Sequence, residues 1–254
     1  MEHASLQSQL KDAPCTVEDT EEIFWLRELD DCQSLTSLGN ALAAQYRFKD
    51  AIDAYQKALQ IRDDDWMLWN RLAGSYLTLL RFKEAKDCYD KCLALKAPIS
   101  SAAYPIGVWH FLSGDYESAA DWFAKCLPCS DELGIAVLYW HALSCYRAGL
   151  KPQLLAKYHT GMNVGHHTAY ELAVKVFCAL SSVEDAVEWA RKEDDLNAVI
   201  LLYGVCVYLE QAGQTEESLH LRKELLEKDS CWPCISYLAA WNDLTDPQPE
   251  SPAD

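Results

Sequence analysis

The chain has 254 residues, and its 22 Lys and Arg against 39 Asp and Glu give a formal net charge of −17. This acidic balance argues against a nucleic-acid binder, because phosphate backbones are bound by Lys and Arg. Half of the residues are hydrophobic and Gly and Pro are scarce, which excludes wholesale disorder and favours long helices over a β-sandwich or barrel.

The N-terminal part is predicted to contain a flexible segment and one helix. Residues 1–15 are polar and lack the apolar core of a secretory signal. Thr16, with Asp19 three residues later, is typical of a helix start, which predicts a helix from residue 17 to residue 29. We expect residues 16–31 to pack on the segment that follows.

From residue 32 to residue 133 the chain repeats itself every 34 residues. One position of the repeat holds a small residue, a second an alanine and a third an aromatic ring. These positions are occupied by Gly39, Ala73 and Gly107, by Ala51, Ala85 and Ala119, and by Tyr55, Tyr89 and Phe123. Each unit predicts two amphipathic helices, in which the small residues allow close approach and the rings fill the gap between them.

The second unit has its large, small and aromatic residues in the order Trp69-x2-Leu72-Ala73-x2-Tyr76, then Ala85-x3-Tyr89. This pattern resembles the tetratricopeptide repeat. The resemblance implies an all-α fold, a right-handed α-solenoid superhelix of antiparallel helix pairs, with three regular repeats over 32–133.

Beyond the third unit the period weakens, and residues 134–245 are predicted to form degenerate helix pairs with a C-terminal capping helix. The expected helices start near residue 135, cover 152–159, 168–180 and 183–191, form a last unit from about 199, and close over 233–244. Residues 246–254 contain three prolines and are predicted to be a disordered tail. The longest apolar run, Ala198 to Leu209, is too short for a membrane span of about 20 residues, so we expect a soluble cytoplasmic protein without membrane insertion.

In this family the first helices line a concave groove that holds a peptide or helix of a partner. When the groove positions are carried over, the candidate binding residues are Asn40, Asn70, Arg71, Tyr104, Val108, Phe111, Tyr139, Trp140, Leu143, Tyr146 and Arg147. An aromatic groove suits a partner with apolar anchors, and the net charge favours a basic partner. The alternative is that Tyr104, Phe111, Tyr139 and Trp140 pack against the next repeat or the C-terminal helices.

Two CxxC pairs, Cys126–Cys129 and Cys231–Cys234, could form a zinc site or a redox centre. The pairs are far apart in the chain, no βαβ pattern surrounds them, and Cys126 occupies a small-residue position of the repeat. We therefore predict no metal and no cofactor, with Cys231 and Cys234 as the remaining metal candidates. A thiol- or zinc-regulated sensor is the alternative function.

Histidines offer the other candidate chemistry. His159, His166 and His167 gather in one irregular stretch, where a metal site and a polar loop are both conceivable and the polar loop is preferred. His110 and His141 fall at repeat positions that predict core residues. No nucleotide loop, HExxH or GxSxG motif is present, so we predict no catalytic residues. The sequence indicates a non-enzymatic adaptor or scaffold that binds a protein or peptide, without naming that partner or the oligomeric state.

Overall fold

The computed structural model describes Leu6 and residues 19–245, and all regular structure in these residues is helical. The chain divides into two compact units, residues 1–102 (unit 1) and residues 103–254 (unit 2). Two predicted segments lie outside the described residues: the flexible N-terminus over 1–15, Leu6 excepted, and the tail over 246–254.

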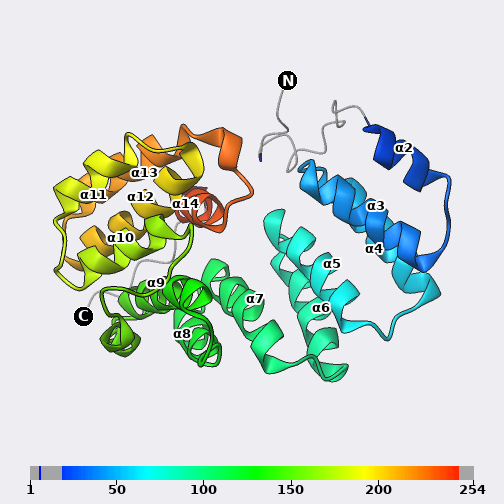
Figure 1. Ribbon diagram of the computed structural model, residues 1–254, viewed down its shortest axis with the longest axis horizontal. Helices are drawn as coiled ribbons and strands as arrows, with labels where there is room; N and C mark the ends of the chain where they lie inside the picture. Colours follow the sequence, from blue (N-terminus) through cyan, green and yellow to red (C-terminus); the bar gives the residue numbers. More distant parts are fainter. Residues whose placement is uncertain (1–5, 7–18, 246–254) are drawn as a thin grey trace. The chain divides into compact units, whose positions relative to one another are not determined.

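Unit 1 is a succession of helices joined by short connections. They are α2 (Glu21–Arg27), α3 (Cys32–Ala44), α4 (Phe48–Ile61), α5 (Trp66–Thr78) and α6 (Phe82–Ala94). Helix α3 packs on α4, α5 packs on α6, and α4 packs on α5, so that two helix pairs stack in chain order (Figure 1). A further helix, α7 (Ile99–Leu112), begins in unit 1 and continues into unit 2.

Helix α2 begins later than the sequence predicts. The expected cap, Thr16, lies outside the described residues, and Asp19 and Thr20 are not helical. Thr20 caps the helix that begins at Glu21, because its hydroxyl accepts a hydrogen bond from a backbone N–H of the first turn. The carboxylate of Asp19 is instead bound by Arg27, with 2.7 Å between Nε and Oδ2.

A glycine lets the two helices of the first repeat touch. A Cβ on Gly39 of α3 would lie 2.6 Å from Cδ1 of the Tyr55 ring in α4, which is closer than any side-chain contact allows. Ala51 and Ala85, at the predicted alanine position, have no exposed surface, and the Tyr89 ring is buried. The predicted packing of small residues against rings is therefore confirmed in unit 1.

The turn between the paired helices uses the same backbone conformation in successive repeats. Tyr46 and Leu80 have φ values of 61° and 56°, and Gly114 has a φ of 82°. The left-handed conformation costs a residue with a side chain about 1–2 kcal/mol, and it is commonly adopted where a helix ends. The repeat period therefore extends from the side chains to the backbone.

Unit 2 contains the second helix of the third repeat and the helices that follow it. They are α8 (Tyr116–Ala124), α9 (Asp131–Arg147), η1 (Gln153–Lys157), α10 (Thr168–Phe177), α11 (Val183–Ala190), α12 (Asp195–Gln211), α13 (Thr215–Leu226), η2 (Asp229–Cys231) and α14 (Ile235–Thr245). Helix α9 begins at residue 131, a turn before the expected 135, because the Ser130 hydroxyl accepts a hydrogen bond from the backbone N–H of Leu133. The short partner expected over 152–159 is the 3₁₀ helix η1.

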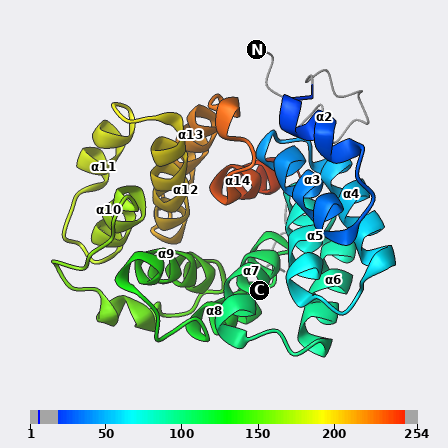
Figure 2. The ribbon, with the colours of Figure 1, turned by 45° about the vertical axis from the view of Figure 1, so that its right-hand side comes forward.

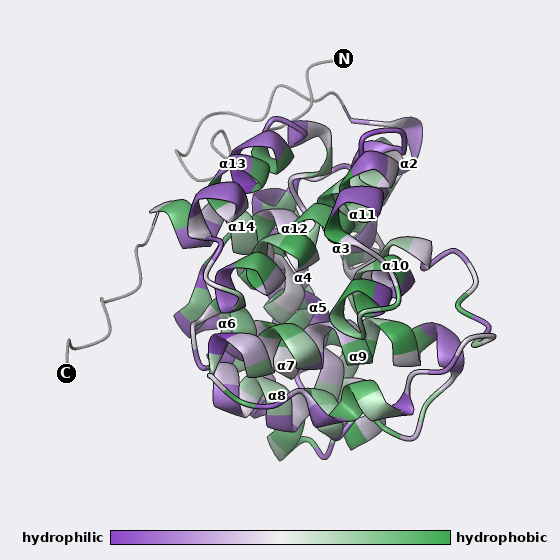
Figure 3. Cartoon of the chain, turned by 90° about the vertical axis from the view of Figure 1, so that its left-hand side faces the viewer, coloured by the Kyte–Doolittle hydropathy of each residue, from purple (hydrophilic) through white to green (hydrophobic). Residues whose placement is uncertain are grey.

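Helix α12 is the centre of unit 2. It packs on α9, α10, α11, α13 and α14, and Figure 2 shows it between α11 and α13. Its side chains are buried over nearly its whole length, and Figure 3 shows hydrophobic residues along it and hydrophilic residues on much of α13. Gly204 permits the closest approach, since a Cβ there would lie 2.6 Å from Cε2 of Tyr139 in α9. A helix that is apolar all round is typical of a protein core.

The predicted fold class, an all-α protein of antiparallel helix pairs in the manner of an α-solenoid, is confirmed for the described residues. The apolar run Ala198–Leu209 lies inside α12, where it is buried. Within residues 19–245, no helix reaches both the length and the apolar character that a bilayer crossing demands.

Candidate functional site

Polar residues occupy predicted groove positions on two helices of unit 1, and two of them are joined by a hydrogen bond. Asn40 lies in α3, and Asn70 and Arg71 lie in the first half of α5. The side-chain oxygen of Asn40 accepts hydrogen bonds from Nη1 of Arg71 and from the hydroxyl of Tyr55, each at 2.9 Å. Arg71 is exposed, and the two asparagines are half-buried. We call Asn40, Asn70 and Arg71 the polar face of unit 1.

An apolar side chain and an open stretch of backbone lie on the same side of α5 as Arg71. Met67 precedes Arg71 by one turn, and residues four apart share a helix face. Met67 is 50% exposed. Apart from its chain neighbours and the backbone of its own helix, no described atom lies within 4 Å of the position that a Cβ on Gly74 would take. A cation, a thioether and uncovered backbone are therefore available within two turns of this helix.

The aromatic groove candidates of α9 lie in the core of unit 2. Tyr139 and Trp140 have no exposed surface. The hydroxyl of Tyr139 donates a hydrogen bond to the carbonyl of Ile200 at 2.7 Å, and the Trp140 ring meets the buried Phe111 ring edge-on at 5.1 Å. These three side chains therefore pack inside unit 2, as the alternative to the groove prediction expects. Their contacts connect α7, α9 and α12.

The other groove candidates of unit 2 are divided between core and surface. Val108 and Leu143 are buried, whereas Tyr104 and Tyr146 are half-buried. Tyr146 packs edge-on against Phe177, with ring centres 5.6 Å apart. Of these four residues, only the two tyrosines keep part of their surface exposed.

Arg147, the last groove candidate, belongs to a buried ion network. Its Nη2 lies 2.5 Å from Oδ2 of Asp243, and its Nη1 lies 3.1 Å from Oε2 of Glu210. Arg222 pairs with the same two carboxylates, so the network joins α9, α12, α13 and α14. Burial raises the pKa of Asp243, although both arginines oppose this shift. The guanidinium of Arg147 is therefore occupied inside unit 2.

The two CxxC pairs do not have the environment of reactive thiols. Cys126 is buried, Cys129, Cys231 and Cys234 are half-buried, and all four are free. Burial raises the pKa of each thiol, to about 11 for Cys126 and Cys234. Because the thiolate is the nucleophile, the raised pKa values disfavour redox chemistry at these thiols.

A cysteine–histidine pair in α9 was not predicted as a unit. Nε2 of His141 lies 3.7 Å from Sγ of Cys145, and both residues are buried. Burial lowers the pKa of His141 to about 4 and raises the pKa of Cys145 to about 11. Both groups are neutral at pH 7, whereas a catalytic pair needs an activated thiolate. His141 is thus a core residue, as predicted, while His110 is half-buried beside Asp115.

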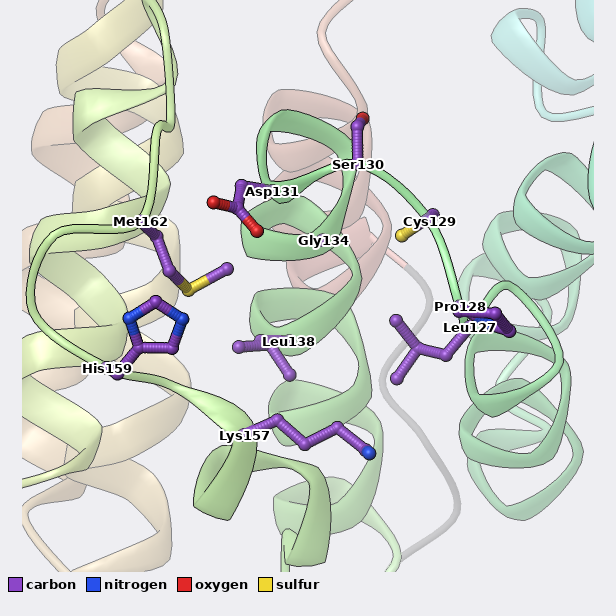
Figure 4. A pocket seen from close by; sticks show the side chains of 10 residues that line it. All are labelled: Leu127, Pro128, Cys129, Ser130, Asp131, Gly134, Leu138, Lys157, His159 and Met162. Carbon is purple, nitrogen blue, oxygen red and sulfur yellow. The ribbon is translucent and has the colours of Figure 1, made fainter.

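A cavity of about 390 Å³ opens beside α9 in unit 2. Figure 4 shows His159 and Met162 on one side of it, Cys129 on the other, and Gly134 on α9 between them. A Cβ on Gly134 would lie 3.7 Å from Cε of Met162 and 3.8 Å from Sγ of Cys129. A Cβ on Gly134 would therefore fit at ordinary contact distances between Met162 and Cys129, which line the cavity.

The structure divides the predicted histidine cluster. His159 lines the cavity, whereas His166 and His167 lie beside Glu132 in the first turn of α9. Glu132 was not among the predicted site residues. An acidic residue in the first turn of a helix is already explained by its favourable interaction with the helix dipole, so the sequence gives no sign of a further role.

Two family models, both described as the tetratricopeptide repeat, match residues 32–62 and residues 68–98. Both matches lie in unit 1, over the pairs α3–α4 and α5–α6. No curated protein sequence matches the chain. A similar solved structure is the crystal structure of YrrB, described as a TPR protein with an unusual peptide-binding site. It is 13% identical, with a TM-score of 0.47, and the match covers 89% of this chain and 98% of that chain.

Proposed function

We propose that this chain, which is a tetratricopeptide repeat protein, is an interaction adaptor or scaffold whose polar face in unit 1 holds a peptide or helix of a partner. The observation that carries this proposal is the arrangement of Arg71. Its guanidinium is exposed, and its hydrogen bond to Asn40 fixes the direction in which it points. A guanidinium has further N–H donors in a planar fork, and these suit the carbonyl oxygens of an extended peptide.

The neighbouring side chains indicate the chemistry of the partner. The exposed thioether of Met67 lies one turn from Arg71 and favours an apolar anchor, because methionine adapts to irregular apolar shapes. The uncovered backbone at Gly74 leaves space for a main chain. The net charge of −17 favours a segment with basic residues through electrostatic steering.

The finer parts of the proposal concern the remaining groove candidates. Asn70 completes the polar face. Tyr139 and Trp140 stabilise the packing of unit 2 and do not contact the partner. A non-enzymatic role and a cytoplasmic location belong to the same proposal.

Peptide display against the full-length chain, followed by titration of a selected peptide, tests the assignment. We expect Arg71→Ala and Met67→Ala to weaken binding by about 1–2 kcal/mol each, about five- to thirtyfold, with the helical circular dichroism signal unchanged. Arg62→Ala is the matched control, because Arg62 is an exposed arginine of unit 1 that follows α4 and pairs with Asp65. If Arg71→Ala and Met67→Ala bind the selected peptides as tightly as the unaltered chain, the polar face is not the binding site.

A further inference from the structure

Three side chains that are common metal ligands meet at the first turn of α9 in unit 2. Glu132 belongs to α9, whereas His166 and His167 end the loop over 158–167 that precedes α10. One ligand atom from each residue, a carboxylate oxygen or a ring nitrogen, lies within 4.8 Å of the other two. Imidazole and carboxylate are ligands of zinc, and three protein ligands suffice where water supplies the fourth.

The spacing of these atoms fits a shared ion better than direct hydrogen bonds. Oε1 of Glu132 lies 3.6 Å from Nδ1 of His166 and 3.6 Å from Nδ1 of His167. A direct N–H···O hydrogen bond would bring each pair to about 2.9 Å. Two ligands that each lie about 2.1 Å from a tetrahedral zinc ion are about 3.4 Å apart. The carboxylate oxygen therefore stands at the distance at which one ion can contact it and each ring.

His167 gives a second and independent indication of a ligand. Its Nδ1 atom is buried, yet it has no hydrogen-bond partner among the residues that the structure describes. A buried polar atom without a partner is destabilising, and native structures rarely retain one without a reason. Coordination of an ion would satisfy this nitrogen.

The backbone of the loop holds the ligands together before any ion arrives. Gly165 has a φ of 56°, and a Cβ on it would lie 2.7 Å from Oε1 of Glu132, so the carboxylate depends on the glycine for its position. The N–H of Asn163 donates a hydrogen bond to Oδ2 of Asp131 at 3.1 Å. The loop is thus fastened to the first turn of α9, and ligands held in this way lose little freedom when they bind.

We propose that Glu132, His166 and His167 form a binding site for a divalent transition-metal ion, zinc being the species that this ligand set favours. The ion joins the loop over 158–167 to α9. The His166 side chain is 88% exposed, so the site opens to solvent and has space for water ligands.

Zinc titration of the full-length chain by calorimetry, after chelator treatment and under reducing conditions, tests the site. We expect one equivalent to bind, and we expect Glu132→Gln, His166→Ala and His167→Ala to weaken it by about 100-fold or more, because even partners outside the ligand set change affinity by 10–100-fold. His159→Ala is the matched control, because His159 belongs to the same loop but lines the cavity. It should bind zinc like the unaltered chain.

The thiols require a separate readout, since the chain has 11 cysteines. Cobalt in place of zinc should give a spectrum without the sulfur-to-cobalt charge-transfer band. Zinc should also raise the thermal midpoint of the unaltered chain, but not that of the three variants, whose metal-free midpoints and helical signal should equal those of the unaltered chain. Absence of zinc binding, unchanged affinity in the histidine variants, or a sulfur-to-cobalt band would each overturn the proposal.

Discussion

Unit 1 and unit 2 bury their helices in different ways. In unit 1 a small residue on one helix receives a ring from its partner, as Gly39 receives Tyr55. Ion pairs such as Lys86–Asp90 lie at its surface, and a single buried arginine, Arg47, pairs with the partly exposed carboxylates of Asp19 and Asp50 among the residues that the structure describes. In unit 2 several helices surround α12, and a group of four charged side chains is enclosed between them. A short repeated pattern can therefore specify the packing of neighbouring helices, whereas a central helix also needs contacts between residues far apart in the chain.

The difference has an energetic counterpart. Exposed ion pairs contribute about 0–1 kcal/mol, because water already solvates both charges. Enclosed charges have lost that water, so removal of one partner leaves the other without compensation. We therefore expect the loss of a charge from the enclosed network of unit 2 to cost much more stability than the loss of an exposed partner such as Asp90 in unit 1.

The largest effect should come from breaking the ion network. Asp243→Ala leaves Arg147 and Arg222 enclosed with one carboxylate between them, and the free energy of unfolding should fall by about 3–5 kcal/mol. Asp90→Ala removes the exposed partner of Lys86 in unit 1 and should cost less than about 1 kcal/mol. Urea denaturation followed by circular dichroism measures both. Equal losses in the two variants would remove the proposed contrast between the units.

A second effect should be a pH dependence of stability that arises in unit 2 from His141, a buried residue of α9. Burial lowers the pKa of His141 from 6.5 to about 4, so between these values the unfolded chain binds a proton that the folded chain excludes. This contribution to stability is present above pH 6.5 and is lost as the pH falls towards 4, by about 2 kcal/mol after allowance for solvent screening.

The test of this effect is the pH dependence of the urea midpoint. His141→Leu should make the fall between pH 6.5 and pH 4 smaller than in the unaltered chain, because leucine has no proton to bind, while the paired carboxylates, such as Glu84 and Glu224, titrate in both. A variant whose midpoint falls as steeply as that of the unaltered chain would show that His141 is not responsible.

The sequence predicts most of unit 1 because its contacts are local. Gly39 and Tyr55 lie on consecutive helices, and their spacing recurs in the next repeats, so the pairing follows from the repeat alone. The repeat position of Arg147 predicts a groove residue in the same way, but the structure places its guanidinium in the ion network of unit 2. Its acidic partners Glu210 and Asp243 come from α12 and α14, and no periodicity connects them with α9.

The candidate sites follow the same division. Asn40 and Arg71 were predicted from their repeat positions, and the hydrogen bond between them lies within unit 1. Glu132 could not be joined to His166 and His167, because their proximity depends on how an irregular loop returns to α9. Tyr139 and Trp140 lie in the core because α12, a helix much later in the chain, packs against them. Their repeat positions alone do not reveal this burial.

The smallest effect tests the small-residue packing of unit 1. Gly39→Ala places a Cβ against the Tyr55 ring, and such overpacking should lower the free energy of unfolding by about 1–2 kcal/mol. Gly74→Ala is the matched control, because Gly74 is also a helical glycine of unit 1, but outside its chain neighbours and its own helix backbone no described atom lies within 4 Å of its Cβ position. It should stabilise by about 0.4–1 kcal/mol, since alanine favours the helix. If the two substitutions change the urea midpoint in the same direction, the close approach of the two helices does not explain why this repeat position holds a small residue.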